Sequence, residues 1–508
     1  MKTGMFGYMN TNASENVNNK LPQMPVRIQR LIIGGLTVLF AILFLGIGFH
    51  AAGPGFPLDD AWIHQTYARN LAFNGRWELI QGQVSGGSTS PLWTMLLSLG
   101  PLLGFKTPYF WTSFLSIAAF TGTTLTGFAI IRKKTASNHP LIVAGVLLLA
   151  LEWHLLWSAA SGMETILFCF LCLLVFNVLL GEKYYLVLGL LSGLIVWVRP
   201  DGITMLGPVF LILFWRLIKK QVSFASVLAV IFPILIMLGL YGWFNYSITG
   251  MVFPNTMYAK QLEYADALQQ SIYLRMGKNF LVPVSGAGLF LIPGFIQSVR
   301  QAIVKRDVWL ASAILWFIGY GTIYAIKLPM VYQHGRYHIP LIPIFFMIGI
   351  IGTVSLYSAV IKNKPKWKPL AKMTIGLSGV TAILFAVVGQ AAFINDIRTI
   401  DRLMIEPAEW INANTPGDAL IAAHDIGAMG YFGERDIIDL AGLIEPEIIP
   451  IIRNESAIRE YLIKLDADYL VVFEDWYPDL KDFGKEEKQF DFSVSGANEI
   501  VEIRNLNE

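Results

Sequence analysis

Charged residues are scarce in this 508-residue sequence, and their scarcity indicates the class of protein. Asp, Glu, Lys and Arg make up 15% of the chain, against 55% hydrophobic residues and a mean hydropathy of +0.54. Soluble domains have about 25% charged residues, so this composition excludes a soluble protein and predicts a polytopic membrane protein. The formal net charge of +2 argues against nucleic-acid binding, which requires a concentrated basic face.

Cysteine is nearly absent as well. Cys169 and Cys172 have the CxxC spacing of some metal and redox sites, but they lie in the apolar run ILFCFLCLLVF and the chain has no further cysteine. We interpret them as small core residues of a helix in lipid. The first apolar segment also lacks a small-residue cleavage site after it, so we expect a retained helix in place of a signal peptide.

Long apolar runs are abundant. A helix crosses the hydrocarbon layer, about 30 Å thick, with roughly 17 to 25 residues, and the sequence predicts about eleven such spans. They are residues 30–49, 109–131, 140–158, 163–181, 184–198, 203–218, 223–243, 285–299, 308–326, 338–360 and 373–393. The run at 91–104 is short and contains Pro101, so we expect it to lie along the interface or to dip in and return.

Basic residues support this topology. If the polar tail 1–29 is cytoplasmic, the loops on that side carry the Lys and Arg residues that the positive-inside rule requires. These are Arg132, Lys133, Lys134, Arg216, Lys219, Lys220, Arg300, Lys305, Arg306, Lys362, Lys364, Lys366 and Lys368. We therefore predict a transmembrane domain at 30–394, with a long outer loop at 54–108.

The unusual polar motifs all fall on the opposite side of the predicted membrane. They are LDDAWIHQTYARN (58–70), SGGSTSPLW (85–93), SGMET (161–165), RPDG (199–202), FPNTMYAK (253–260) and HGRYHIP (334–340). An enzyme that works at the outer surface requires such one-sidedness, whereas a transporter places polar groups near the midplane, between related repeats. We find no internal repeat, so the pattern favours an enzyme.

The character of the chain changes after residue 394. An amphipathic helix is followed by the buried strand ALIAAH (419–424), the segment RDIIDLAG, a helix near 455–465 and the strand DYLVVFED (468–475). This alternation predicts a small α/β domain at 395–508, outside the membrane. We interpret the three glycines of HDIGAMGYFG (424–433) as loop residues in preference to a phosphate site.

An acidic pair, Asp59 and Asp60, follows the first span with no Lys or Arg beside it. Such a pair at a membrane surface points to a proton, a metal or a sugar hydroxyl. The alternative is that Asp59 only caps a helix that begins at Ala61. Asp60, His64 and Tyr67 share one helix face, where His64 would tune the acid or contact an acceptor, unless it is an ordinary interfacial histidine.

The ordered motifs resemble a known family. They run DDAxxxxxYARNLxxxGxW, GxTSPLWT, SGMET, RPDG, FPNTxYAK, RYxxPLxP, DxGAxGYF and DLAGLxEPEI, over roughly residues 30–450. This order is similar to that of the GT-C superfamily of glycosyltransferases, which use lipid-linked sugars. Within the superfamily, the chain most resembles the branch that includes the terminal arabinofuranosyltransferases of mycobacterial cell walls.

The resemblance implies an activity. It implies transfer of a sugar, arabinofuranose or another pentose or hexose, from a polyprenyl-phosphate carrier to a glycan, lipid or protein of the cell envelope, at the outer face of the plasma membrane. It also implies an acidic general base in the first outer loop, which here is Asp59 or Asp60, with a slight preference for Asp59. The alternatives are a protein or lipid glycosyltransferase of the mannosyl or aminosugar type, and a transporter or flippase for a lipid-linked sugar.

A donor phosphate needs fixed positive charge. Arg336 is the first candidate, because a guanidinium holds a phosphate through two hydrogen bonds, and an anchor among lipid headgroups is its alternative. Glu164 is either a second acid or a charge at a helix start, and Arg199 with Asp201 is a structural ion pair or part of the site. Further substrate contacts are expected from Lys260, His334, His338, Asn255, Tyr258 and Tyr337. We assign no cofactor; a divalent cation on the acidic pair and Glu164 is the alternative.

Overall fold

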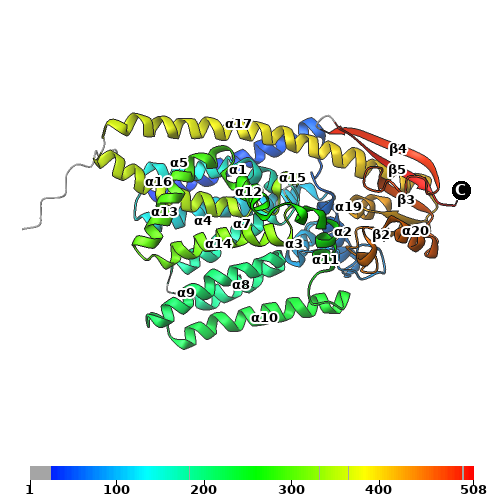
Figure 1. The fold of residues 1–508 in the computed structure, drawn as a ribbon, viewed down its shortest axis with the longest axis horizontal. Coiled ribbons are helices and arrows are strands. Elements are labelled where there is room, and N and C mark those ends of the chain that lie inside the picture. The colour runs from blue at the N-terminus through cyan, green and yellow to red at the C-terminus, as the bar shows by residue number, and fades with distance from the viewer. Residues whose placement is uncertain (1–23, 182, 331, 364, 495–496, 508) are drawn as a thin grey trace, which may run out of the picture.

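The computed structural model describes residues 24–181, 183–330, 332–363, 365–494 and 497–507. A bundle of long helices carries a small sheet domain at one end, which we call the site end (Figure 1). Most of the predicted tail 1–29 lies outside the described residues. Eight helices of the described chain are long and apolar enough to cross a membrane, which identifies a multi-pass membrane protein. They are α1 (Val26–Ala52), α4 (Tyr109–Thr135), η1 with α9 (Pro200–Ile218), α10 (Phe224–Thr249), η3 with α13 (Gly286–Val304), α14 (Val308–Lys327), α16 (Leu341–Asn363) and α17 with its extension (Lys368–Asn414).

Three further predicted spans have less regular counterparts. The span at 140–158 is a pair of helices, α5 (Pro140–Ala150) and α6 (Trp153–Ala160), bent by 50° at their break. The other two are the short apolar helices α7 (Thr165–Leu179) and α8 (Tyr185–Val198). The cysteines of α7 are free and fully buried, as expected of core residues. The run at 91–104 forms α3 (Pro91–Leu102), which has only 12 residues and is too short to cross.

The two ends of the bundle differ in chemistry, as the topology predicts. At one end the basic loops meet, because Lys134 Nζ lies 2.5 Å from Asp307 Oδ2 and Arg216 donates to the carbonyl oxygen of Gly181. The polar motifs lie at the site end, on α2 (Asp59–Asn74), α11 (Asn255–Glu263) and the turn α15 (Tyr332–Gly335). The sequence analysis assigned no element to α12 (Ile272–Val284), which is also apolar on one face.

The sheet domain has five strands in the order β2-β1-β3-β5-β4. β1 pairs in parallel with β2 and with β3, whereas β5 is antiparallel to β3 and β4. The predicted strands β1 and β3 and the helix α20 are confirmed, and the hairpin of β4 and β5 was not predicted. The bounds are β1 (Leu420–Ala423), α19 (Ile426–Ala428), β2 (Asp436–Asp439), α20 (Glu455–Lys464), β3 (Tyr469–Phe473), β4 (Lys485–Val494) and β5 (Ala497–Asn505).

The last span continues directly into the sheet domain. α17 (Lys368–Ile400) runs through the π-helical turn η5 (Asp401–Ile405) into α18 (Glu406–Asn414), so the predicted boundary after residue 394 falls inside a helix. One hydrophobic cluster then joins the two parts. It includes Ile63 and Tyr67 of α2 together with Leu403, Ile411 and Ile421 of the helix extension and the sheet. Burial of this shared apolar surface holds the sheet domain against α2.

Candidate functional site

Asp60 lies between two cations at the site end. Its carboxylate forms an ion pair with the Arg336 guanidinium, and Oδ1 lies 3.4 Å from Lys260 Nζ. The three residues come from the first turn of α2, from α11 and from the segment that precedes α16. The structure thus brings together three of the predicted site residues, each from a different polar motif.

Burial strengthens the interactions between these three charged side chains. Burial alone would raise the pKa of Asp60, but the neighbouring Arg336 and Lys260 hold that pKa well below its usual range. Asp60 in turn keeps the pKa of Lys260 above its usual value, despite burial. Arg336 is only 4% exposed and its Nη2 donates to the hydroxyl of Tyr337 at 3.0 Å. The alternative that Arg336 anchors lipid headgroups is therefore wrong, because the side chain faces the protein interior.

Asp59 has quite different surroundings. Its Oδ2 accepts a hydrogen bond from the backbone N–H of Gly427 and its Oδ1 from that of Ala428, each at 2.7 Å. Burial and the charge of Asp425 raise the pKa of Asp59 despite these two hydrogen bonds. The expectation that the helix begins at Ala61 is wrong, since α2 begins at Asp59, after Leu58, with no side chain as its cap. The capping alternative falls with it, because both Asp59 oxygens bind the sheet domain.

A buried polar network lies behind Asp60 on the same helix face. His64 is 2% exposed; its Nδ1 lies 3.0 Å from Thr94 Oγ1 and its Nε2 lies 3.5 Å from Glu164 Oε2. Glu164 Oε1 accepts a hydrogen bond from Arg199 Nη1 at 3.1 Å, and Arg199 Nε also pairs with Asp201 at 3.1 Å. His64 is therefore no surface histidine. The predicted pair of Arg199 and Asp201 is confirmed, and Glu164 belongs to the same network.

Tyr67 and Asn255 adjoin the loop at 85–90. The hydroxyl of Tyr67 lies 2.6 Å from Ser85 Oγ and accepts a hydrogen bond from the N–H of Gly87 at 2.9 Å. Asn255 is 1% exposed, and its Oδ1 has no hydrogen-bond partner among the described residues. Tyr258, on the same helix as Asn255, is 37% exposed. Tyr67 thus holds the glycine-rich loop in place, which leaves Asn255 as a free polar group beside it.

The two histidines expected near the phosphate lie elsewhere. His334 Nε2 is 2.7 Å from Asp396 Oδ2, and its ring packs edge-on against Trp153 and Trp157. His338 is fully buried, and its ring contacts Tyr324. The structure therefore does not bring either histidine to the Asp60 ion pairs.

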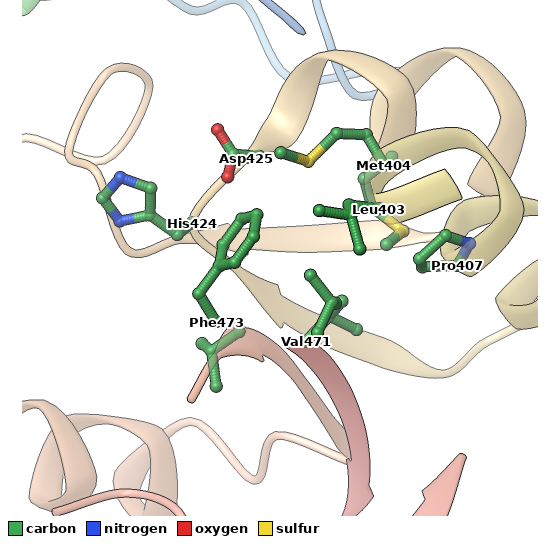
Figure 2. A pocket seen from close by; sticks show the side chains of 10 residues that line it. Leu403, Met404, Pro407, His424, Asp425, Val471 and Phe473 are labelled. Carbon is green, nitrogen blue, oxygen red and sulfur yellow. The ribbon is translucent and has the colours of Figure 1, made fainter. Parts of the chain in front are cut away.

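Three residues beside Asp60 were missed by the sequence analysis. Asp425 lies close enough to Asp60 and Lys260 for their charges to change its pKa, and His424 Nε2 lies 3.5 Å from Glu263 Oε1. Figure 2 shows His424 and Asp425 at one end of a pocket whose other labelled residues are apolar. A signal existed, because both follow a buried strand directly, in a glycine-rich turn that we interpreted only as a loop.

The acidic residues of the site do not form a metal-binding site among the described residues. Across the described ranges, no group of three or more His, Cys, Asp or Glu side chains is arranged to hold a metal ion. Asp59 binds backbone N–H groups, Asp60 binds two cations and Glu164 binds Arg199. The alternative of a divalent cation held by Asp59, Asp60 and Glu164 stays a prediction, because these three carboxylates bind different partners.

A family model described as "Domain of unknown function (DUF8728)" matches residues 395–502. A comparison with curated proteins gives no significant match.

Solved structures resemble the chain over almost its whole length. ArnT from Cupriavidus metallidurans, bound to undecaprenyl phosphate, has 11% identity and a TM-score of 0.56, covering 92% of this chain and 98% of that one. The Archaeoglobus fulgidus oligosaccharyltransferase in complex with Zn and sulfate has 12% identity and a TM-score of 0.54, covering 92% and 72%. The same enzyme was solved tethered to an acceptor peptide containing the NVT sequon (11% identity, TM-score 0.54, 93% and 74%). These likenesses confirm the predicted GT-C-like fold, while the arabinofuranosyltransferase branch stays a prediction.

Proposed function

We propose that this protein is a glycosyltransferase that moves a sugar from a polyprenyl-phosphate carrier to a cell-envelope acceptor at the outer face of the plasma membrane. The observation that carries the proposal is the meeting of Asp60 with Arg336 and Lys260 in one buried site. Phosphate recognition needs fixed cations, and proton abstraction needs a carboxylate within reach of the hydroxyl. The shared fold with ArnT, whose structure holds undecaprenyl phosphate, supports a lipid-linked donor.

Arg336 and Lys260 have the donor phosphate as their proposed ligand. Both side chains are largely buried and come from different segments, so their geometry is fixed before a donor arrives. A guanidinium presents paired N–H groups to phosphate oxygens, and an ammonium adds a compact charge. Both charges also stabilise the phosphate as it leaves with the electron pair of the broken bond.

Asp60 is the proposed general base, in place of the slight preference for Asp59. Its carboxylate faces the cations, whereas both oxygens of Asp59 are held by the sheet domain. In the reaction, Asp60 takes the proton of the acceptor hydroxyl while that oxygen bonds to the anomeric carbon. The bond from the anomeric carbon to the phosphate oxygen breaks, and its electron pair stays on the polyprenyl phosphate.

The ion pairs of Asp60 couple donor binding to base activity. In the structure the Asp60 carboxylate forms ion pairs with Arg336 and Lys260, the same cations that the donor phosphate requires. When the phosphate binds them, it competes with Asp60, whose carboxylate then becomes free to accept a proton. The donor therefore has to bind before the base is available.

The proposed sugar and acceptor are those that the resemblance to the GT-C superfamily implies. We propose arabinofuranose or another pentose or hexose as the transferred sugar, and a glycan, lipid or protein as the acceptor. The mannosyl and aminosugar types of transferase use the same donor chemistry, so a donor panel separates them. His64, Tyr67, Asn255, Tyr258 and Tyr337 are proposed contacts around that substrate, whereas His334 pairs with Asp396 and the ring of His338 contacts Tyr324.

The experiment is a donor panel with the full chain in nanodiscs. Undecaprenyl phosphate carrying labelled arabinofuranose, mannose, glucose or an aminosugar is incubated with a mixture of octyl glycosides, and label that leaves the lipid is counted. We expect release from at least one donor by the wild type and a loss of about 10²- to 10⁴-fold in Asp60→Asn. Equal release by both proteins refutes the base. If the protein moves intact donor across vesicle membranes and releases no sugar, it is a flippase and the proposed enzyme activity is wrong.

A further inference from the structure

The sheet domain turns the carboxyl ends of its parallel strands toward α2. β1 lies between β2 and β3 and is parallel to both, so the chain leaves β1 toward one neighbour and later returns to the other. In open α/β sheets this reversal of strand order leaves a crevice at the carboxyl ends of the strands, where ligands bind. Here the turns after β1 and β3 lie at that end of the strands, and His424, Asp425 and Phe473 line a pocket there.

The turn after β1 sits against the proposed base. The N–H groups of Gly427 and Ala428 bind Asp59, which directly precedes Asp60 in the chain. His424 Nε2 pairs with Glu263 Oε1 at 3.5 Å, on the same helix as Lys260. The turn after β1 is thereby attached both to α2, which carries Asp60, and to α11, which carries Lys260.

Asp425 is the polar side chain of this turn that has a buried atom without a hydrogen-bond partner among the described residues. Its Oδ2 atom is shielded from solvent and has no hydrogen-bond partner among the described residues. A shielded carboxylate oxygen costs free energy unless a donor reaches it, so such an atom needs a ligand or water to explain it. His424, by contrast, is satisfied, because its Nδ1 also lies 2.6 Å from the hydroxyl of Tyr477.

The turn after β3 carries an exposed aromatic side chain that contacts His424. Trp476 is 51% exposed, and its ring lies 5.0 Å, edge to face, from the ring of His424. On its other side it stacks on Phe473, which fixes its orientation. Trp476 contacts the ring of His424, and Asp425 follows His424 in the chain. The half-exposed indole offers an apolar face and the unpartnered carboxylate offers a hydrogen-bond acceptor, a combination that suits a ring carrying hydroxyl groups.

We propose that Asp425 and Trp476 bind a sugar ring of the acceptor and hold its attacking hydroxyl beside Asp60. This inference rests on the proposed function and assigns the sheet domain, whose family model has no known role, to acceptor recognition. Asp425 accepts a hydrogen bond from a hydroxyl of the acceptor ring, and Trp476 covers one face of that ring. Asp425 is thus a binding and positioning residue, and Asp60 remains the base.

The test measures acceptor binding without transfer. Full-length protein in nanodiscs is probed by saturation-transfer NMR with octyl arabinofuranoside, octyl mannoside and octyl glucoside, in the wild type and in Asp425→Ala, Asp425→Asn and Trp476→Ala. We expect the best-bound glycoside to lose affinity by about tenfold or more in Asp425→Ala and Trp476→Ala, as when a hydrogen bond to a charged group is lost. Asp425→Asn keeps one acceptor oxygen and should lose less. Asp436→Ala, at the opposite end of the neighbouring strand, should bind as the wild type does.

Undecaprenyl phosphate affinity is measured on the same samples. It should be unchanged in all four variants, because the cations stay in place. Equal glycoside binding by the wild type, Asp425→Ala and Trp476→Ala overturns the proposal, as does the absence of binding by any glycoside. A parallel loss of undecaprenyl phosphate affinity also overturns it, since it reveals a structural role. If no donor in the donor panel releases its sugar, the proposed glycosyltransferase function is wrong. The binding results separate that outcome from a failure of the acceptor-binding proposal.

Discussion

Asp59 and Asp60 are neighbours in the chain, yet their side chains belong to different parts of the molecule. Asp59 joins α2 to the sheet domain through two backbone N–H groups, whereas Asp60 joins α2 to Arg336 and Lys260. Successive residues of a helix point about 100° apart, so two adjacent carboxylates can serve two partners. The pair therefore divides into a positioning residue and a proposed base.

This division predicts an unusual affinity change. In Asp60→Asn, the carboxylate that competes for Arg336 and Lys260 is gone, so undecaprenyl phosphate should bind several-fold more tightly even though transfer is lost. Native mass spectrometry of nanodiscs titrated with undecaprenyl phosphate measures the affinity. Asp59→Asn serves as the control and should leave that affinity unchanged. Weaker binding by Asp60→Asn would rule out competition between Asp60 and the phosphate.

Asp425 predicts a pH dependence of acceptor binding. Burial raises the pKa of Asp425 to about 6; Asp60 and Glu263 add to the effect, and His424 and Lys260 oppose it. The nearby Asp59, whose pKa is also raised, is coupled to it through charge. Only the ionised carboxylate accepts hydrogen bonds through both oxygens, so glycoside affinity should rise from pH 5 to pH 7. The same titration on Asp425→Asn should be flat, and an equal rise there would assign the effect to another group.

At the scale of elements, the contact between α19 and the start of α2 requires a glycine. A Cβ atom on Gly427 would lie 2.1 Å from the backbone oxygen of Asp59, so the two backbones approach too closely for any side chain. Gly427→Ala should weaken docking of the sheet domain by about 1–3 kcal/mol, the usual range for overpacking. Hydrogen exchange of residues 424–433 measures the loss. Gly417→Ala, where nothing lies within 4 Å of the added atom, should exchange as the wild type does.

The turns that precede α7 and α9 depend on one buried cation. Arg199 pairs with Glu164 and Asp201 and also donates to the hydroxyl of Tyr324. Arg199→Met removes the buried cation that two carboxylates share and should destabilise the protein by about 3–5 kcal/mol. Thermal unfolding in detergent tests this. Arg402→Met, which removes an exposed pair with Glu406, should cost about 1 kcal/mol or less, and an equal shift in both variants would contradict a special role for Arg199.

At the scale of the whole molecule, the membrane part could be predicted well from the sequence. Apolar length and basic loops determine which segments cross and which ends lie together, and both signals are local. The meeting of the polar motifs followed from that topology, as the contacts of Asp60 with Lys260 and of Glu164 with Arg199 confirm. The resemblance added the expected GT-C-like fold, which the solved structures share.

Other features depend on contacts that no local pattern reveals. Asp59 and Gly427 are 368 residues apart, so nothing near either residue predicts their hydrogen bond. The hairpin of β4 and β5 was missed because β4 begins with the charged run KEEK, while Phe490 and Phe492 pack against the core of the sheet domain. Asp425 was overlooked because its turn was interpreted as a loop, and only the folded structure brings that turn to Asp59 and near Asp60 and Lys260.

The most direct measurement identifies the products of one reaction cycle. Wild-type protein in nanodiscs is mixed with undecaprenyl-phosphate-linked labelled sugar and an octyl glycoside, and the quenched mixture is analysed by mass spectrometry. The account predicts one molecule of undecaprenyl phosphate for each glycosylated acceptor, with the phosphate left on the lipid, and both products formed about 10²- to 10⁴-fold more slowly in Asp60→Asn. A sugar phosphate transferred to the acceptor, or full product formation by Asp60→Asn, would contradict it.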